Sequence, residues 1–374
     1  MAKPLQLSII GVKGYPYVYG GYETLIKELA ERISEKNVEV TVYCHQSLFA
    51  NRPKKVGNVK LVYIPCIESK ALSQLTHSLL STIHACFSKA DIVFYVNAAN
   101  GPFGYLTRLF KKKTVINVDG LEWLRPKWKG WGAKYFYYAA KKATQLFDVV
   151  VTDAFEMQNI YQQQFNCESK MIAYGTDAFK EQPVSLLAPW NLQGQDYYLI
   201  VGRLIPDNNS DLLIDGFLQS NSQKKLVIVG DDVFNDDFSV QIKNKIKDCS
   251  NIVFTGYVKD VNLLSAFYQH AFAYLHGHEF GGTNPTLVKA MGAGSYIMAL
   301  KNKFSEEVLQ QGKHGDLFEK NSSSLSELML NAEKSDQASS LRIENMRKLS
   351  KEGLVDRYQW DTIVDQYYQI FINL

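Results

Sequence analysis

Residues 5–33 read "LQLSIIGVKGYPYVYGGYETLIKELAERI" and join three kinds of local pattern in a diagnostic order. The short apolar run at 5–11 predicts a strand, and the glycine-rich stretch after it predicts a loop. A helical pattern then begins near Gly21. A strand, a glycine-rich loop and a helix in succession are the repeating unit of parallel α/β sheets.

The same alternation continues along the chain. Short runs rich in β-branched residues are separated by longer helical patterns, and the runs are apolar throughout rather than at every second position. This pattern indicates parallel strands in sheets covered by helices on both faces. The predicted strands are 5–11, 38–44, 59–65, 91–97, 113–120, 148–153, 170–174, 197–202, 225–230, 251–256, 271–276 and 295–300.

Length and composition limit the remaining possibilities. The chain has 374 residues, room for two domains, and the stretch 175–196 loses periodicity and reads as the linker between them. A formal net charge of +3 is too small to indicate nucleic-acid binding. The five cysteines are scattered without metal-ligand spacing, no signal peptide is recognisable and no long apolar run occurs. We therefore expect a cytoplasmic protein, with a peripheral membrane contact left open.

Four loops after predicted strands are candidate sites. Gly20 and Gly21 follow the first strand and would let a ligand approach the backbone, with a structural turn as the alternative. Arg203 follows the strand 197–202, where a guanidinium suits a diphosphate. The alternative is a surface arginine paired with an acid such as Asp207. Asp119 ends the strand 113–120 and is placed to orient or deprotonate a hydroxyl, or simply to cap a turn.

The fourth loop is "EFGGTNPTLVKAMGAG" at 279–294. Asn284 is expected to cap a helix that has Pro285 at its first position, and Gly281 and Gly282 leave the approach open. Free N–H groups near Thr286 and Leu287, with the helix dipole, would attract phosphate. The alternative is a well-capped structural helix.

A basic and aromatic segment occupies 111–142. Its charges are nine Lys or Arg against two acids, with tryptophans and tyrosines between them. This mixture fits an anionic membrane surface or a lipid diphosphate, and a solvated basic face fits it equally well. The acidic stretch 230–238 and the pair His276 and His278 are discounted as metal sites, because acids favour a helix start and the histidines lack a third ligand.

These landmarks together resemble the retaining GT-B glycosyltransferases, in particular the branch of bacterial rhamnosyltransferases that assemble capsule and exopolysaccharide. The likeness rests on "GVKGYPYVYGGYETLIKELAERI", "VINVDGLEW", "VGRLIPDNN" and "HGHEFGGTNPTLVKAM", in order along nearly the whole chain. It implies two Rossmann-like domains that face a cleft, 1–180 for the acceptor and 181–355 for the nucleotide sugar. It also implies that a final helix at 356–374 crosses back to the first domain.

The resemblance also implies roles for particular residues. Asp119 and Arg203 would be catalytic, and no metal or other cofactor would be needed, because arginine and helix N–H groups neutralise the diphosphate. The donor-binding set would be Gly20, Gly21, Arg203, Asn208, Glu279, Gly281, Gly282, Thr283, Asn284 and Lys289. Two positions depart from the pattern. Asn208 and Asn209 stand where relatives often have a lysine, and Lys289 stands where the wider branch has a glutamate for the ribose hydroxyls.

The expected function is transfer of a hexose, with a deoxyhexose such as rhamnose as the first candidate, from a nucleoside diphosphate to a hydroxyl of a bacterial surface glycan or lipid-linked oligosaccharide. The expected partners are that donor, that acceptor and an anionic membrane touched through 111–142, without nucleic acid. Two alternatives remain at this stage: a nucleotide-sugar epimerase and a non-catalytic scaffold, the latter favoured by Lys289 and Asn208.

Overall fold

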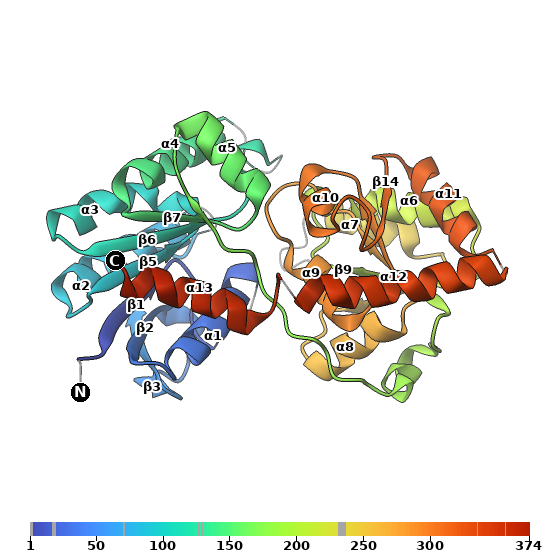
Figure 1. The fold of residues 1–374 in the computed structure, drawn as a ribbon, viewed down its shortest axis with the longest axis horizontal. Coiled ribbons are helices and arrows are strands. Elements are labelled where there is room, and N and C mark those ends of the chain that lie inside the picture. The colour runs from blue at the N-terminus through green and yellow to red at the C-terminus, as the bar shows by residue number, and fades with distance from the viewer. Residues whose placement is uncertain are drawn as a thin grey trace. The chain divides into compact units, whose positions relative to one another are not determined.

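The computed structural model of the chain describes residues 3–16, 20–69, 72–125, 128, 130–230, 237–334, 336–355 and 357–374. The chain divides into two compact units, the first formed by 1–175 with 360–374 and the second by 176–359 (Figure 1). Each unit is a parallel sheet with helices, so the predicted α/β class is confirmed.

The first unit contains an eight-stranded sheet in the order β3-β4-β2-β1-β5-β6-β7-β8. All neighbours pair in parallel except β3 and β4, which form a short antiparallel pair. The strands are β1 (Leu5–Ile10), β2 (Val38–His45), β3 (Lys55–Val56), β4 (Val59–Ile64), β5 (Ile92–Val96), β6 (Lys113–Val118), β7 (Val149–Thr152) and β8 (Lys170–Met171). The helices are α1 (Gly21–Ile33), α2 (Ser73–Phe87), α3 (Gly104–Leu109), α4 (Trp131–Leu146), α5 (Phe155–Phe165) and α13 (Trp360–Ile372).

Right-handed crossovers determine which helices share a face of this sheet. The chain moves one way from β1 to β2 and the other way from β4 to β8, so α1 lies opposite α2, α3 and α4. The C-terminal helix α13 packs beside α1 (Figure 1). Its Tyr367 hydroxyl accepts a hydrogen bond of 2.8 Å from Asn117 Nδ2. The predicted return of the final helix to the first part of the chain is therefore confirmed, with the helix beginning at Trp360.

The second unit contains a six-stranded, wholly parallel sheet in the order β11-β10-β9-β12-β13-β14. Its strands are β9 (Tyr197–Val201), β10 (Lys225–Val229), β11 (Ile252–Gly256), β12 (Ala273–His276), β13 (Ile297–Leu300) and β14 (Asp316–Phe318). Its helices are α6 (Ser210–Ser220), α7 (Asp237–Ile246), α8 (Val261–His270), α9 (Pro285–Ala293), α10 (Lys303–Val308), α11 (Ser322–Ala332) and α12 (Gln337–Val355). Counted from β9, the order is 3-2-1-4-5-6, which is that of the doubly wound Rossmann fold.

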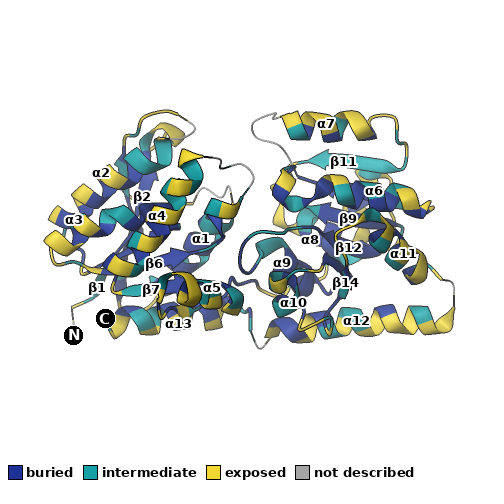
Figure 2. Cartoon of the chain, turned by 90° about the horizontal axis from the view of Figure 1, so that it is seen from above, coloured by how far each residue is buried: buried dark blue, intermediate teal, exposed yellow. Residues whose placement is uncertain are grey.

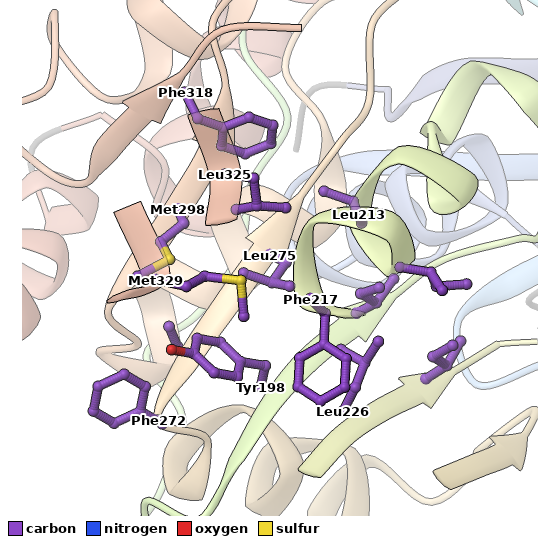
Figure 3. Packing of buried hydrophobic residues seen from close by; sticks show 14 of the residues in the cluster. Tyr198, Leu213, Phe217, Leu226, Phe272, Leu275, Met298, Phe318, Leu325 and Met329 are labelled. Atoms are coloured by element: carbon purple, nitrogen blue, oxygen red, sulfur yellow. The ribbon is translucent and has the colours of Figure 1, made fainter. Parts of the chain in front are cut away.

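The core of the second unit lies between the sheet and the helices α6 and α11 (Figure 3). Phe217 of α6 and Leu325 of α11 pack with strand residues such as Leu226 and Met298, and all four are fully buried. The two helices approach closely at Gly216, where a Cβ atom would lie 2.7 Å from Leu325 Cδ2. This glycine therefore sets the distance between the helices.

The predicted strands all occur within a few residues of their expected positions. Sequence reasoning missed β3 and β14, which are only two and three residues long. The predicted linker contains the 3₁₀ helix η4 (Val184–Trp190), and the boundary between the units falls between Gly175 and Thr176. Most of the acidic stretch 230–238 lies outside the described residues.

Candidate functional site

In each sheet the strand order reverses at one point, and in open α/β sheets ligands bind beyond the carboxyl ends of the strands at that point. In the second unit the reversal lies between β9 and β12. Arg203 follows β9 and Glu279 follows β12, so two candidates predicted from distant parts of the sequence are brought to the same edge. The Arg203 side chain is exposed.

A set of hydrogen bonds joins the loops after β9 and β12. Asn208, in the 3₁₀ helix η5 (Pro206–Asn208), donates from Nδ2 to the Arg203 carbonyl at 2.7 Å. Its Oδ1 therefore accepts from His278 Nδ1, which lies 2.8 Å away. The next residue, Asn209, donates from Nδ2 to the Gly277 carbonyl at 2.8 Å. The backbone around Arg203 is thus held by groups from the other strand end.

Glu279 is half-buried and lies beside a cation. Its Oε2 is 2.6 Å from Lys320 Nζ, and its backbone N–H donates to the Asp207 carbonyl at 3.0 Å. Asn302 also donates, from Nδ2, to the His278 carbonyl at 3.0 Å. Sequence reasoning missed Lys320 and Asn302, because they come from the segments around β14 and β13 and reach the site only through the strand order.

The start of α9 confirms one prediction and corrects another. Asn284 is the N-cap and Pro285 opens the helix, as expected. The N–H groups of Thr286 and Leu287, however, are not free: the first donates to Asn284 Oδ1 at 2.9 Å and the second to the Asn284 carbonyl at 3.1 Å. The capping residue that marks the helix start is itself the acceptor.

The loop before α9 contains two buried glycines, Gly281 and Gly282. The amides of Gly281 and Gly282 donate to no acceptor within the part of the chain that the structure describes. Gly281 has φ of +126°, a conformation that favours glycine. Thr283 is buried next to them, and Lys289 is half-buried one turn into the helix.

A buried chain of hydrogen bonds supports this helix start. The Thr286 hydroxyl donates to Asn284 Oδ1 and the Tyr274 hydroxyl donates to Thr286 Oγ1, each at 2.8 Å. Because the Tyr274 hydroxyl donates its proton to Thr286, its oxygen must act as the acceptor toward His276 Nδ1, 3.1 Å away. The neutral His276 ring therefore carries its proton on Nδ1. Burial lowers the pKa of His276 to about 3, so the ring is neutral at physiological pH. This series of hydrogen bonds therefore gives His276 a structural role in supporting the start of α9.

In the first unit, Gly20 and Asp119 lie near the start of α1. Gly20 is the N-cap of α1, and its carbonyl accepts from Thr24 N and Oγ1, each at 3.2 Å. Asp119 is half-buried just beyond β6, and its backbone N–H donates to the Tyr22 hydroxyl at 3.3 Å. Burial and the neighbouring Asp119 raise the pKa of Tyr22 well above its usual range, so Tyr22 keeps its proton.

A cavity about the size of one water molecule lies between these groups. Tyr174 lines it and donates from its hydroxyl to the Gly21 carbonyl. Asp153 and Tyr367 also line it, and neither these two nor Tyr174 was found from the sequence. In the loop between β1 and α1, Tyr15 is buried and its hydroxyl donates to Glu31 Oε1 at 3.1 Å, while Tyr17 and Tyr19 lie outside the described residues.

The predicted residues thus fall into two groups. Gly20, Gly21 and Asp119 lie in the first unit, and the others lie in the second. Within the described residues no cluster of His, Cys, Asp and Glu is arranged to hold a metal ion. No helix in that part of the chain has both the length and the hydropathy that a membrane span requires.

Two family models match the chain in succession. Residues 5–177 match a domain of unknown function, DUF1972, and residues 195–333 match the family described as glycosyl transferases group 1. The second unit therefore contains a glycosyltransferase group 1 domain, and the predicted enzyme class, glycosyltransferase, is confirmed at that level. No curated protein matches the sequence.

Solved structures match over almost the whole chain and confirm the GT-B fold. Sucrose-phosphate synthase from Thermosynechococcus elongatus superposes with a TM-score of 0.81 at 16% identity, covering 99% of this chain and 98% of that one. HepE from Anabaena, solved with UDP-glucose, has a TM-score of 0.77 at 16% identity and 99% coverage of both chains. A glycosyltransferase from Rickettsia africae has a TM-score of 0.74 at 13% identity, covering 100% and 99%. At these identities the likeness shows the fold alone.

Proposed function

We propose that the protein transfers a hexose from a nucleoside-diphosphate sugar to a hydroxyl of a bacterial surface glycan or a lipid-linked oligosaccharide, with retention of anomeric configuration. The proposal is supported by the edge of the second sheet, where the loops that carry Arg203, Gly281 and Gly282 follow β9 and β12, the strands on either side of the reversal point of a glycosyltransferase group 1 domain. A guanidinium and backbone amides are the groups that bind a diphosphate.

The donor is proposed in two steps. HepE was solved with UDP and with UDP-glucose, which makes uridine diphosphate the first nucleotide to test. The sugar remains a prediction from the sequence, with rhamnose as the first candidate. Lys289 carries a charge that cannot accept hydrogen bonds from ribose hydroxyls, and we assign it to the phosphates instead.

The chemistry proposed for these groups is electrostatic. As the bond between the sugar and the diphosphate breaks, negative charge grows on the leaving oxygen, and Arg203 with the glycine amides stabilises that charge. The leaving diphosphate takes the proton of the acceptor hydroxyl on the same face of the sugar. The residues around Asp119 and Gly20 are assigned to the acceptor, with Tyr22 donating and Asp119 orienting. No metal enters this scheme.

The site of action is proposed to be the cytoplasmic face of the cell membrane, since a lipid-linked acceptor would lie there. The basic segment 111–142 is the part assigned to that contact.

A thermal-shift panel tests the proposal. The purified chain is melted with UDP, UDP-glucose, dTDP-rhamnose and, as a control, UMP, with and without EDTA. A ligand that prefers the folded state raises the melting temperature, and we expect at least one diphosphate to do so more than UMP. The same donor is then incubated without acceptor, where an epimerase would interconvert the sugar. Absence of a shift with every diphosphate would contradict the proposed donor class.

A further inference from the structure

Helix α2 has its polarity reversed. An amphipathic helix of a globular protein normally buries its apolar side chains and exposes its polar ones. Here the buried side chains are His77, Ser78, Ser81, Thr82, Ala85 and Cys86. The exposed side chains include Leu79, Leu80, Ile83 and Phe87, and Phe87 keeps 76% of its surface accessible. Exposed residues are coloured yellow along α2 in Figure 2.

Internal hydrogen bonds hold part of the buried polar side of α2, whereas the ring nitrogens of His77 and the Ser81 hydroxyl have no hydrogen-bond partner among the described residues. The Thr82 hydroxyl donates to the Ser78 carbonyl at 2.7 Å, and it lies 2.8 Å from the hydroxyl of Tyr95, a residue of the strand beneath. Rotating the helix to bury its leucines would break these bonds and leave polar groups in the core. The orientation of α2 is therefore set by its buried side, and its apolar side remains for a partner.

The apolar side continues onto α3 and α4, which pack in succession beside α2. The rings of Phe87 and Phe110 meet edge to face with centroids 4.8 Å apart, and Leu109 next to Phe110 is 74% exposed. Lys142 of α4 lies over the ring of Tyr105, 5.4 Å from its centroid. We call the exposed side of α2, α3 and α4 the α2–α4 surface.

Every charged side chain in the three segments that form this surface is basic. Residues 72–90, 98–113 and 130–147 contain no Asp or Glu. Their cations are Lys89, Arg108, Lys111, Lys112, Lys113, Lys134, Lys141 and Lys142. All but Lys112 and Lys142 are exposed, and Lys112 donates to the Ser88 and Ala90 carbonyls at the end of α2.

We propose that the α2–α4 surface docks onto an anionic lipid membrane, with the apolar side chains of α2 and α3 entering the boundary between headgroups and acyl chains. Exposed leucine and aromatic side chains on segments whose own charged residues are all basic match that boundary in both polarity and charge, although the exposed acids Asp91 and Asp148 directly follow two of the segments. A second copy of the chain fits poorly, because a symmetric pair would place the same lysines against each other, and lysine is depleted in protein interfaces.

The proposal extends the sequence prediction, which located only the basic segment 111–142. The apolar contribution of α2 was not visible there, because an apolar stripe at helical spacing indicates a buried face. The inference rests on the membrane contact of the proposed function and deepens it. Docking does not depend on which nucleotide the second unit binds, so failure to dock and failure to bind a donor are distinguishable.

Co-sedimentation with vesicles tests the surface. The whole chain is mixed with vesicles of phosphatidylcholine alone or with added phosphatidylglycerol, at low and high salt. We expect binding to the anionic vesicles that weakens with salt. The double variant Phe87→Ser/Leu109→Ser and the triple variant Lys134→Gln/Lys141→Gln/Lys142→Gln should each bind at least tenfold more weakly. The control is Leu330→Ser/Leu341→Ser, which changes leucines of the second unit that are 54% and 57% exposed and should bind like the wild type.

Thermal melting shows whether each variant is folded, and we expect little loss of stability because the changed residues are exposed or, at Lys142, half-buried. Equal sedimentation of the wild type and both surface variants would overturn the proposal, as would failure of the wild type to bind anionic vesicles. Sedimentation velocity without lipid tests the alternative that a second copy of the chain occupies the α2–α4 surface. A dimer that Phe87→Ser/Leu109→Ser abolishes would assign the surface to self-association and overturn docking to lipid.

Discussion

Asn208 and His278 are joined side chain to side chain, with 2.8 Å between Oδ1 and Nδ1, although they follow different strands. This contact ties the loop after β9 to the loop after β12 and holds the backbone that carries Arg203. Asn208 stands where relatives of the proposed class often carry lysine. The structure therefore gives it a positioning role in place of a charge.

Replacing Asn208 by alanine should weaken nucleotide binding without unfolding the second unit. The change removes the bonds to His278 and to the Arg203 carbonyl, each worth about 1 kcal/mol. We expect roughly tenfold weaker UDP binding in calorimetric titration. Asn331→Ala, on the exposed side of α11, is the matched control. Unchanged affinity in Asn208→Ala would show that the contact does not position the donor.

Arg203→Ala should slow turnover. If the guanidinium meets the developing charge on the diphosphate, its loss costs about 2 kcal/mol or more of transition-state stabilisation. The melting temperature should stay close to that of the wild type, because the side chain is exposed. Arg203→Lys keeps the charge but loses the bidentate hydrogen-bonding geometry, so its turnover should lie between those of the wild type and Arg203→Ala. The measurement is sugar transfer with the donor found in the melting panel, and normal turnover in Arg203→Ala would remove the residue from the mechanism.

The strand pattern and the helix start at Asn284 were predictable because they depend on local periodicity and capping. The contact between Asn208 and His278 was not, since it depends on the strand order that places β9 beside β12. The N–H of Thr286 illustrates a third case. The sequence identified Asn284 as the N-cap. An N-cap side chain accepts a hydrogen bond from an amide of the first helical turn, so Asn284 both marks the helix start and occupies the N–H of Thr286.

The α2 helix shows where periodicity misleads. An apolar stripe indicates a face that avoids water, but the sequence does not say what covers it. In α2 the sheet takes the small polar side, and Leu79, Leu80 and Ile83 stay exposed. Sequence reasoning is similarly limited at Lys289. A lysine side chain cannot accept hydrogen bonds from ribose hydroxyls, but the residue type does not identify which group it contacts instead.

Gly20→Ala should reduce activity while lowering stability only slightly, because alanine is a poorer N-cap than glycine. The φ angle of Gly20 is −158°, an extended conformation open to any residue, and the nearest atom to an added Cβ is 3.4 Å away. Nothing described in the chain therefore requires glycine there, and a ligand approaching the start of α1 would. We expect a small fall in melting temperature and a higher KM for the acceptor. A normal KM would reduce Gly20 to a structural turn.

Gly230→Ala should lower the stability of the second unit. An added Cβ would lie 1.8 Å from the Gly202 carbonyl oxygen, and both partners are backbone at the ends of neighbouring strands. Overpacking of this kind typically costs about 1–3 kcal/mol, and a rigid backbone neighbour places this site at the upper end. The second unit should melt at lower temperature. Gly194→Ala is the control, because the nearest atom to its added Cβ is 4.0 Å away.

The first unit should lose stability in mild acid because of two buried histidines. His45 and His77 stack with ring centroids 3.8 Å apart, and burial lowers the pKa of His45 to about 4 and that of His77 to about 3. In the unfolded chain both pKa values return to about 6.5, so the unfolded state binds more protons between these limits. Stability is then fully present above about pH 6.5 and falls as the pH drops toward about 4, by up to about 1.4 kcal/mol per pH unit for each histidine. His77→Leu should flatten the dependence of unfolding free energy on pH. Parallel pH profiles for His77→Leu and the wild type would show that the stacked pair does not govern acid sensitivity.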